Sequence, residues 1–301
     1  MDNIRTPKFY RFFYDCETSG RQAQKSQVLE YAAVIEDNFG QQVETVEIKI
    51  LLKPGHIAEP EALRINKIDP YSLEWINSAI SEKEAAKKLF ELSQKYKVND
   101  VRPIFIAYKV DFDKGHAAEM FFRHSLNFYD SFNSSLVDPL KTAQFLIKKE
   151  KLKTKIIENA KGKLYNSAKL VDVADALQIK VENAHRALSD AQTLQSVTHK
   201  LYEIYTGKPF SSADANPSLY KKNQVIYVVS DSAKSGLKKR YLKIVENSPA
   251  LGQLKAIDIS DYADNGKSPS NLRTFNYATI IDELPVNPVM EEDIHCLFAN
   301  C

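Results

Sequence analysis

Short apolar runs in the first two thirds of the chain are separated by turns and by longer segments with apolar residues at helical spacing. The aromatic-rich run Phe9–Tyr14 and the run Ile104–Tyr108 predict buried strands, and Val28–Ile35 predicts a third strand. A further strand is expected over Glu44–Leu52, with the glycine-containing segment Asp37–Gln41 as the turn before it.

Helical spacing characterises much of the remaining sequence up to residue 205. Ser81 and Glu84 form a candidate capping box for a helix that ends near Lys95. Further helices are expected after the loop that begins at Pro54, from Asp111 or Asp113 to Ser125, and over Ser135–Lys149, Leu170–Leu177 and Ala187–Tyr205. Strands followed by helices that alternate with strands predict an α/β domain with a central mixed sheet.

The composition changes at Gly207–Pro217, which is rich in Ser, Pro and Ala. We therefore expect a domain over residues 1–207, a linker over 208–217 and a small, mostly-β domain over 218–301. Within the second domain, turn residues separate four expected strands. These strands are Gln224–Ser230, Tyr241–Val245, Leu254–Ile259 and Thr274–Ile281.

Composition narrows the class of protein without giving its function. The 301 residues are 44% hydrophobic with a net charge of +2, and these values argue against a disordered chain, a collagen-like repeat and a membrane protein. The widely spaced Cys16, Cys296 and Cys301 argue against a disulfide scaffold or a zinc site and favour a reducing compartment. Because the chain shows no signal-peptide layout and no run long enough to span a bilayer, we expect a cytoplasmic protein.

Two carboxylates stand where the first strand ends. Asp15 and Glu17 are two residues apart, so on a strand they point to the same face. Like charges held so close are unfavourable unless a cation neutralises them, and a divalent metal is the natural candidate. The alternative is a pair of solvated charges. Asp113 follows the strand Ile104–Tyr108 at a strand-to-helix junction, and functional sites of α/β proteins gather beyond the carboxyl ends of the strands. The alternative is that Asp113 or Asp111 simply caps the helix.

His185 and Asp190 lie five residues apart at the start of the long helical pattern. On one ideal helix this spacing separates two side chains by about 140°. The two side chains converge only if His185 lies in the loop before the helix and leans inward, which Asn183 and Ala184 favour. The alternatives are a surface histidine and a solvated helical aspartate.

Taken together, the order Asp-x-Glu, Asp and His-x4-Asp resembles the DEDD superfamily of 3′→5′ exonucleases, in its histidine-containing branch. The resemblance implies a ribonuclease H-like fold and two-metal-ion phosphodiester hydrolysis. It also implies that Asp15, Glu17 and Asp190 hold the metal that binds the attacking water, that Asp15 and Asp113 hold the second metal, and that His185 is the general base. Oxygen ligands favour two Mg²⁺ ions, with Mn²⁺ as a substitute.

The sequence is further similar to the bacterial exonuclease I family, through Phe13–Thr18, Pro60–Ile68 and Val110–Asp113. This likeness implies single-stranded DNA as the partner and an SH3-like second domain, for which residues 279–286 are the clearest match. The candidates for contact with the substrate are Thr18, Leu63, Ile65, Tyr108 and Phe112.

Three departures from that family are visible. The chain stops at Cys301, without the family's C-terminal helical domain, and Lys109 replaces an asparagine that usually precedes the second motif. The second domain carries a basic cluster, which is either a solvated turn or a track for a phosphate backbone. The cluster consists of Lys234, Lys238, Lys239, Arg240 and Lys243.

Three other interpretations stay open. The same chemistry could act on RNA, as in the RNA-trimming and oligoribonuclease members of the superfamily. The chain could instead be a nucleic-acid-binding protein that keeps a nuclease-like fold with little turnover. The third interpretation is that the motifs are coincidental, in which case the four carboxylates would lie apart in the structure.

Overall fold

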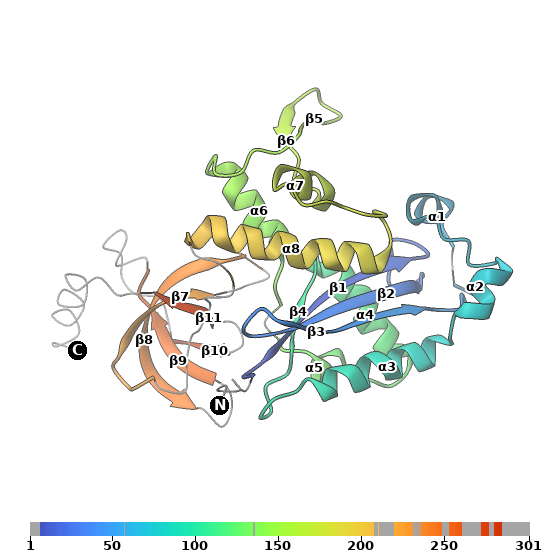
Figure 1. The fold of residues 1–301 in the computed structure, drawn as a ribbon. Helices are drawn as coiled ribbons and strands as arrows, with labels where there is room; N and C mark the ends of the chain where they lie inside the picture. Colours follow the sequence, from blue (N-terminus) through green and yellow to red (C-terminus); the bar gives the residue numbers. More distant parts are fainter. Residues whose placement is uncertain are drawn as a thin grey trace, which may run out of the picture.

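A four-stranded mixed sheet forms the centre of the first part of the computed structural model (Figure 1). Its strand order is β3-β2-β1-β4, with antiparallel β1–β2 and β2–β3 pairs and a parallel β1–β4 pair. The strands are β1 (Tyr10–Thr18), β2 (Val28–Asp37), β3 (Gln42–Lys49) and β4 (Ile104–Ile106). The structure describes residues 7–56, 58–134, 136–207, 210, 220–230, 234, 236–248, 253–260, 272–276 and 280–284.

Helices cover both faces of this sheet (Figure 1). Phe12, Tyr14 and Cys16 of β1 pack in a core that includes residues of α3 (Glu82–Lys95), α4 (Val110–Arg123) and α5 (Phe128–Ser131). Phe13 packs on the other face, against α8 (Ala187–Thr206). Because successive side chains of a strand alternate between faces, Asp15 and Glu17 belong to the α8 face.

The predicted helices are present with small changes in their ends. The predicted cap of α3 is confirmed, since the Ser81 hydroxyl accepts a hydrogen bond from the Glu84 N–H at 3.2 Å. The helix expected from residue 135 begins instead at Pro139, because Asp138 caps it. The remaining helices are α1 (Pro60–Asn66), α2 (Leu73–Ser78), α6 (Pro139–Lys148) and α7 (Leu170–Ala176). None of the helices in the described ranges is long and apolar enough to cross a membrane.

Three short elements have no counterpart in the sequence-based prediction: α2, α5 and a hairpin between α6 and α7. The hairpin consists of β5 (Ile156–Glu158) and β6 (Leu164–Asn166), which pair only with each other and project away from the sheet (Figure 1). Strands of three residues are too short to show a clear alternation, so their pattern gave no signal.

The strands after residue 220 form a second, five-stranded sheet of order β10-β9-β8-β7-β11. The prediction of one strand over Thr274–Ile281 is wrong. The segment contributes to two strands at opposite edges of the sheet, because one part pairs with β9 and the other with β7. The strands are β7 (Val225–Ser230), β8 (Lys238–Ser248), β9 (Gln253–Asp258), β10 (Leu272–Asn276) and β11 (Ile280–Leu284).

The second sheet packs against α6 and α8. Tyr202 of α8 forms an apolar cluster with Val229 and Leu237, and the Leu237 N–H donates to Thr142 Oγ1 at 2.9 Å. The same cluster includes Phe210, the one residue of the predicted linker that lies within the described residues. Buried apolar contacts therefore join the second sheet to α8, the helix that covers one face of the first sheet.

The basic cluster of the second domain does not form a uniform solvated surface. Arg240 is buried, and its guanidinium forms an ion pair with Asp258 at 2.6 Å. The Lys239 ammonium lies 5.5 Å from the centre of the Tyr205 ring. Arg240 therefore stabilises the second sheet internally.

Candidate active site

Four carboxylates from three elements meet at the end of β1. Asp15 and Glu17 lie on the face of β1 that α8 covers, and Asp190 is in the first turn of α8. Asp113 is in the first turn of α4, which follows β4. Burial, followed by the charges of Asp113, Asp190 and Glu17, raises the pKa of Asp15, so the four groups are electrostatic neighbours.

Asp113 has a specific contact with β1. Its Oδ1 accepts hydrogen bonds from the Cys16 backbone N–H at 3.2 Å and from the Cys16 thiol at 3.4 Å. Asp113 therefore does not cap α4, which begins at Val110 after Lys109 in the left-handed conformation. Cys16 is buried in the core, as its alternation with Asp15 predicts, but its contact with a carboxylate was not foreseen.

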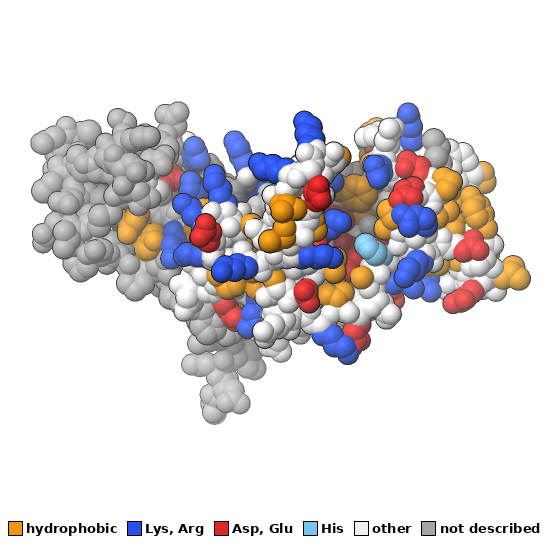
Figure 2. All heavy atoms as spheres, turned by 90° about the horizontal axis from the view of Figure 1, so that it is seen from above, with side chains coloured by type: hydrophobic (Ala, Val, Ile, Leu, Met, Phe, Trp, Pro, Cys, Tyr) orange, Lys and Arg blue, Asp and Glu red, His pale blue; other side chains and the backbone are white. Residues whose placement is uncertain are grey.

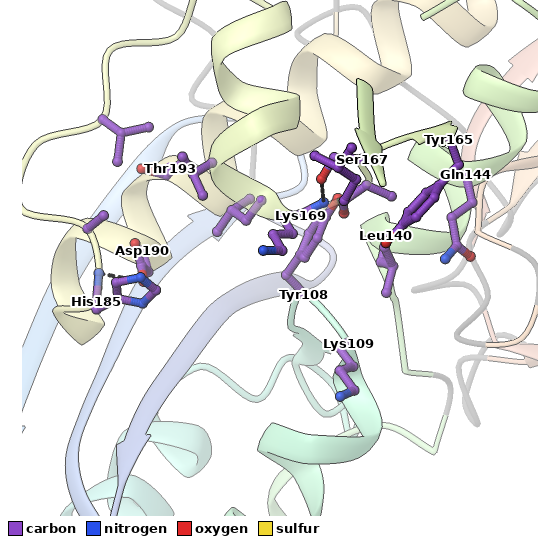
Figure 3. A pocket seen from close by; sticks show the side chains of 16 residues that line it. Tyr108, Lys109, Leu140, Gln144, Tyr165, Ser167, Lys169, His185, Asp190 and Thr193 are labelled. Atoms are coloured by element: carbon purple, nitrogen blue, oxygen red, sulfur yellow. Dashed lines mark hydrogen bonds between the residues drawn. The ribbon is translucent and has the colours of Figure 1, made fainter. Parts of the chain in front are cut away.

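The loop before α8 places His185 beside this cluster. His185 has φ 68°, and its backbone N–H donates to Asp190 Oδ2 at 3.1 Å. Ligand atoms of His185, Glu17 and Asp190 lie within 4.8 Å of one another, so this group could hold a metal ion. The predicted arrangement, with His185 in the loop and its side chain near Asp190, is what the structure shows (Figure 3).

An ion pair that the sequence did not reveal fixes this loop to the sheet. The Arg186 guanidinium binds both oxygens of Glu30 on β2, at 2.6 and 3.1 Å, and the Ala187 N–H donates to the same carboxylate at 3.2 Å. Glu30 is fully buried and stands opposite Glu17 in the β1–β2 register. The signal in the sequence was an acidic residue inside the apolar run Val28–Ile35.

Burial and mutual repulsion favour the protonated carboxyl groups in this cluster. Burial is the main cause of the raised pKa at each position. It raises the pKa of Glu17 to about 7, and the charges of Asp190 and Glu30 add to this effect. It raises the pKa of Asp113 to about 8 and that of Asp190 above its ordinary value. The pKa of Asp15 is raised well above its usual range. A cation bound among these oxygens would offset both causes, and an all-oxygen set suits Mg²⁺ or Mn²⁺.

Among the hollows beside the site, two have a carboxylate of the cluster in their lining, and we name them by the helices beside them. The α1-side hollow has a volume of about 590 Å³, and Glu17, Thr18, Ile65 and Phe112 contribute to its lining. The α7-side hollow has a volume of about 460 Å³ and a mainly apolar lining. Its lining includes Tyr108, Tyr165, Lys169, His185 and Asp190 (Figure 3).

The predicted substrate contacts thus fall in different places. Thr18, Ile65 and Phe112 share the α1-side hollow, whereas Tyr108 lines the α7-side hollow and donates through its hydroxyl to the Ala168 carbonyl at 2.7 Å. Leu63 packs, partly buried, in a small apolar cluster with Leu29, Ile68 and Trp75. Lys109, the residue in the place of the usual asparagine, lines both hollows.

The exonuclease family RNase_T matches residues 12–198 of the chain. The chain is 33% identical over 111 residues to ribonuclease T of Cronobacter sakazakii, and this match covers 35% of this chain and 49% of the relative. It is 34% identical over 125 residues to ribonuclease T of Pectobacterium atrosepticum, and this match covers 39% of this chain and 55% of the relative. The matched segments span about half the length of these curated relatives.

Solved structures of exonuclease I share the fold. Escherichia coli exonuclease I in complex with a dT13 oligonucleotide matches with a TM-score of 0.54 and 16% identity, over 96% of this chain and 70% of that chain. The Methylocaldum szegediense enzyme matches with a TM-score of 0.55 and 16% identity, over 96% of this chain and 67% of that chain. The architecture is therefore the ribonuclease H-like exonuclease fold with a mixed central sheet, followed by additional strands that form the second sheet.

Proposed function

Because the chain belongs to the RNase T family of exonucleases, we propose that it is a metal-dependent 3′→5′ exonuclease that hydrolyses single-stranded DNA to nucleoside monophosphates. One observation carries this proposal: four buried or half-buried carboxylates from β1, α4 and α8 gather beside a histidine at the end of the central sheet. The complex of the structurally similar E. coli exonuclease I with dT13 supports DNA as the substrate.

Each side chain of the cluster has a role in this proposal. Asp15, Glu17, Asp113 and Asp190 would hold two Mg²⁺ ions, which neutralise the charge that develops on the phosphate and the leaving oxygen. His185 accepts the proton of the attacking water, because a ring nitrogen of an imidazole can act as a general base. The Asp190–His185 backbone hydrogen bond and the Arg186–Glu30 pair keep the histidine loop beside the carboxylates.

The α1-side hollow is the proposed place for the 3′-terminal nucleotide. It opens next to Glu17, and Phe112 and Ile65 offer apolar surface for an unpaired base. Stacking on an aromatic ring contributes roughly 1–3 kcal/mol per base and tolerates any sequence. We assign this chemistry to the domain of residues 1–207, joined by the segment 208–217 to the smaller β domain of residues 218–301.

RNA is the second candidate substrate. The two curated relatives at 33% and 34% identity are both named ribonuclease T. A site selective for RNA would form a hydrogen bond to the 2′-hydroxyl of the bound nucleotide. The reaction and the carboxylate cluster are the same in both candidates, so only the sugar separates them.

The proposal is tested with 5′-labelled oligonucleotides of matched DNA and RNA sequence, incubated with Mg²⁺ or with EDTA. We expect a ladder that shortens from the 3′ end on single-stranded DNA and disappears in EDTA. A ladder on RNA alone would move the function to RNA trimming. Binding without any ladder would contradict the proposal and favour a nucleic-acid-binding protein with little turnover.

Two neighbouring aspartates of α4 provide a matched pair of variants. Asp113→Asn removes a buried carboxylate of the cluster, whereas Asp111→Asn changes the same charge on an exposed side chain two residues away. We expect the ladder to be lost in the first variant and kept in the second. Equal activity in both would show that Asp113 has no part in the reaction or that the activity is a contaminant.

A further inference from the structure

The segment between α6 and α7 carries a marked excess of positive charge. We call residues 149–169 the lysine arm; they include the β5–β6 hairpin. The arm contains seven lysines and two glutamates, a net charge of +5 in a chain whose total is +2. The space-filling view from above shows Lys and Arg side chains set around apolar ones on this face (Figure 2).

The arm is continuous with the candidate active site. Ile157, Tyr165 and Lys169 of the arm line the α7-side hollow together with His185 and Asp190 (Figure 3). The hollow therefore leads from the carboxylate cluster to the inner face of the hairpin. Lys109 lies on the lining of both hollows, and so places a cation where one passes into the other.

Alternation along the hairpin places two lysines on its inner face. Ile157 of β5 pairs with Tyr165 of β6, and both line the α7-side hollow. Lys155 lies two positions before Ile157, and Lys163 lies two positions before Tyr165. The hydrogen-bonded pairing of the hairpin includes Lys155, because the Lys155 carbonyl accepts a hydrogen bond from the Ser167 N–H. Residues two apart share a face, so both lysines flank the hollow.

These lysines have the properties of a phosphate-binding surface. Lys155, Lys161 and Lys163 are exposed, and within the part of the chain that the structure describes no ion pair engages them. The half-exposed ring of Tyr165 stands beside Lys163, which combines an aromatic surface with a cation. Cationic grooves with interspersed aromatic rings are the general solution for binding single strands without sequence preference.

We propose that the lysine arm binds the phosphate backbone of the single strand upstream of the nucleotide being removed, with the first upstream base in the α7-side hollow. This inference rests on the proposed nuclease function, because it takes the strand end to lie in the α1-side hollow. It predicts that a long oligonucleotide is held by contacts that a dinucleotide cannot make.

The test measures binding of a fluorescent dT20 oligonucleotide in EDTA, by anisotropy, over a range of NaCl concentrations. The variant is Lys155→Gln/Lys163→Gln, and the matched control is Lys87→Gln/Lys88→Gln on α3, a helix on the opposite face of the sheet. Loss of two phosphate contacts should reduce the slope of log Kd against log salt by about 1.4 and weaken binding roughly tenfold at 0.1 M NaCl. The control should bind like the original protein.

Several outcomes would overturn the inference. They are an unchanged salt slope in the arm variant, an equal loss in the α3 control, or no binding of dT20 by the original protein. Lys155→Arg/Lys163→Arg keeps both charges and must retain affinity, because a loss there would mean that the hairpin has only a structural role. Hydrolysis of the dinucleotide pdTpdT in Mg²⁺ tests the nuclease function separately, since a dinucleotide has no strand beyond the first upstream nucleotide for Lys155 and Lys163 to bind.

Discussion

Replacing Glu17 by glutamine should stabilise the metal-free protein while removing its proposed activity. Glu17 is one of four neighbouring carboxylates that are buried or half-buried, and burial raises its pKa from 4.5 to about 7. At about 1.4 kcal/mol for each pH unit, ionised Glu17 lowers the free energy of unfolding by about 3 kcal/mol. Glutamine has nearly the same size and carries no charge, so the variant avoids this cost.

The effect has a defined pH window. Below pH 4.5 the carboxyl group is protonated in both the folded and the unfolded chain, so it contributes no difference. Between pH 4.5 and about 7 the unfolded chain releases the proton while folded Glu17 keeps it, and stability falls as the pH rises. The advantage of the glutamine variant should therefore grow from near zero at pH 4.5 to its full value above pH 7.

Thermal unfolding in EDTA at pH 5 and pH 8 measures this difference. We expect Glu17→Gln to raise Tm by about 5 °C at pH 8 and by much less at pH 5. Added Mg²⁺ should narrow the gap, because the cation relieves the repulsion only in the original protein. An exposed carboxylate, Glu74, provides the control substitution Glu74→Gln. A lower Tm at pH 8, or an equal gain at pH 5, would refute the reasoning.

Three further predictions address other parts of the molecule. Arg186→Ala leaves the buried Glu30 carboxylate without its guanidinium partner, and chemical denaturation should show that the free energy of unfolding falls by about 2–3 kcal/mol. This loss is smaller than for a fully buried ion pair because Arg186 is 39% exposed. Gly236→Ala should lower Tm, since Gly236 has φ +65° and an added Cβ would lie 2.3 Å from Thr142 Oγ1; an unchanged Tm would contradict this close contact between the two parts of the chain. Phe112→Ala should raise KM for single-stranded DNA roughly 5- to 150-fold in steady-state assays, as expected for one lost stacking contact.

The sequence predicted those parts of the site that depend on local geometry. Asp15 and Glu17 share a face because strand side chains alternate, and His185 approaches Asp190 because it precedes α8 instead of lying on it. Contacts between distant segments were beyond this reasoning. The Cys16–Asp113 hydrogen bonds join residues 97 positions apart, and neither residue carries a local signal that names its partner.

The same distinction explains the errors in the fold. The long runs that became β1, β2 and α8 had enough residues to display a period, and their existence was predicted correctly. The six residues of β5 and β6 are almost all exposed, so no buried face marks them in the sequence. The division of Thr274–Ile281 between two strands depends on which neighbour each part pairs with, which is a property of the whole sheet.

The distribution of charge explains how a nearly neutral chain could handle an anionic polymer. Four carboxylates repel the phosphates that they must process, so the substrate has to be attracted by other groups. Bound metal ions would neutralise the carboxylates at the cleaved bond only, whereas the lysine arm lies one nucleotide or more away and acts on the rest of the strand. Since the arm carries +5 and the whole chain +2, the other residues are acidic in sum. A strand would therefore be favoured in one orientation, with its backbone along the arm and its end among the carboxylates.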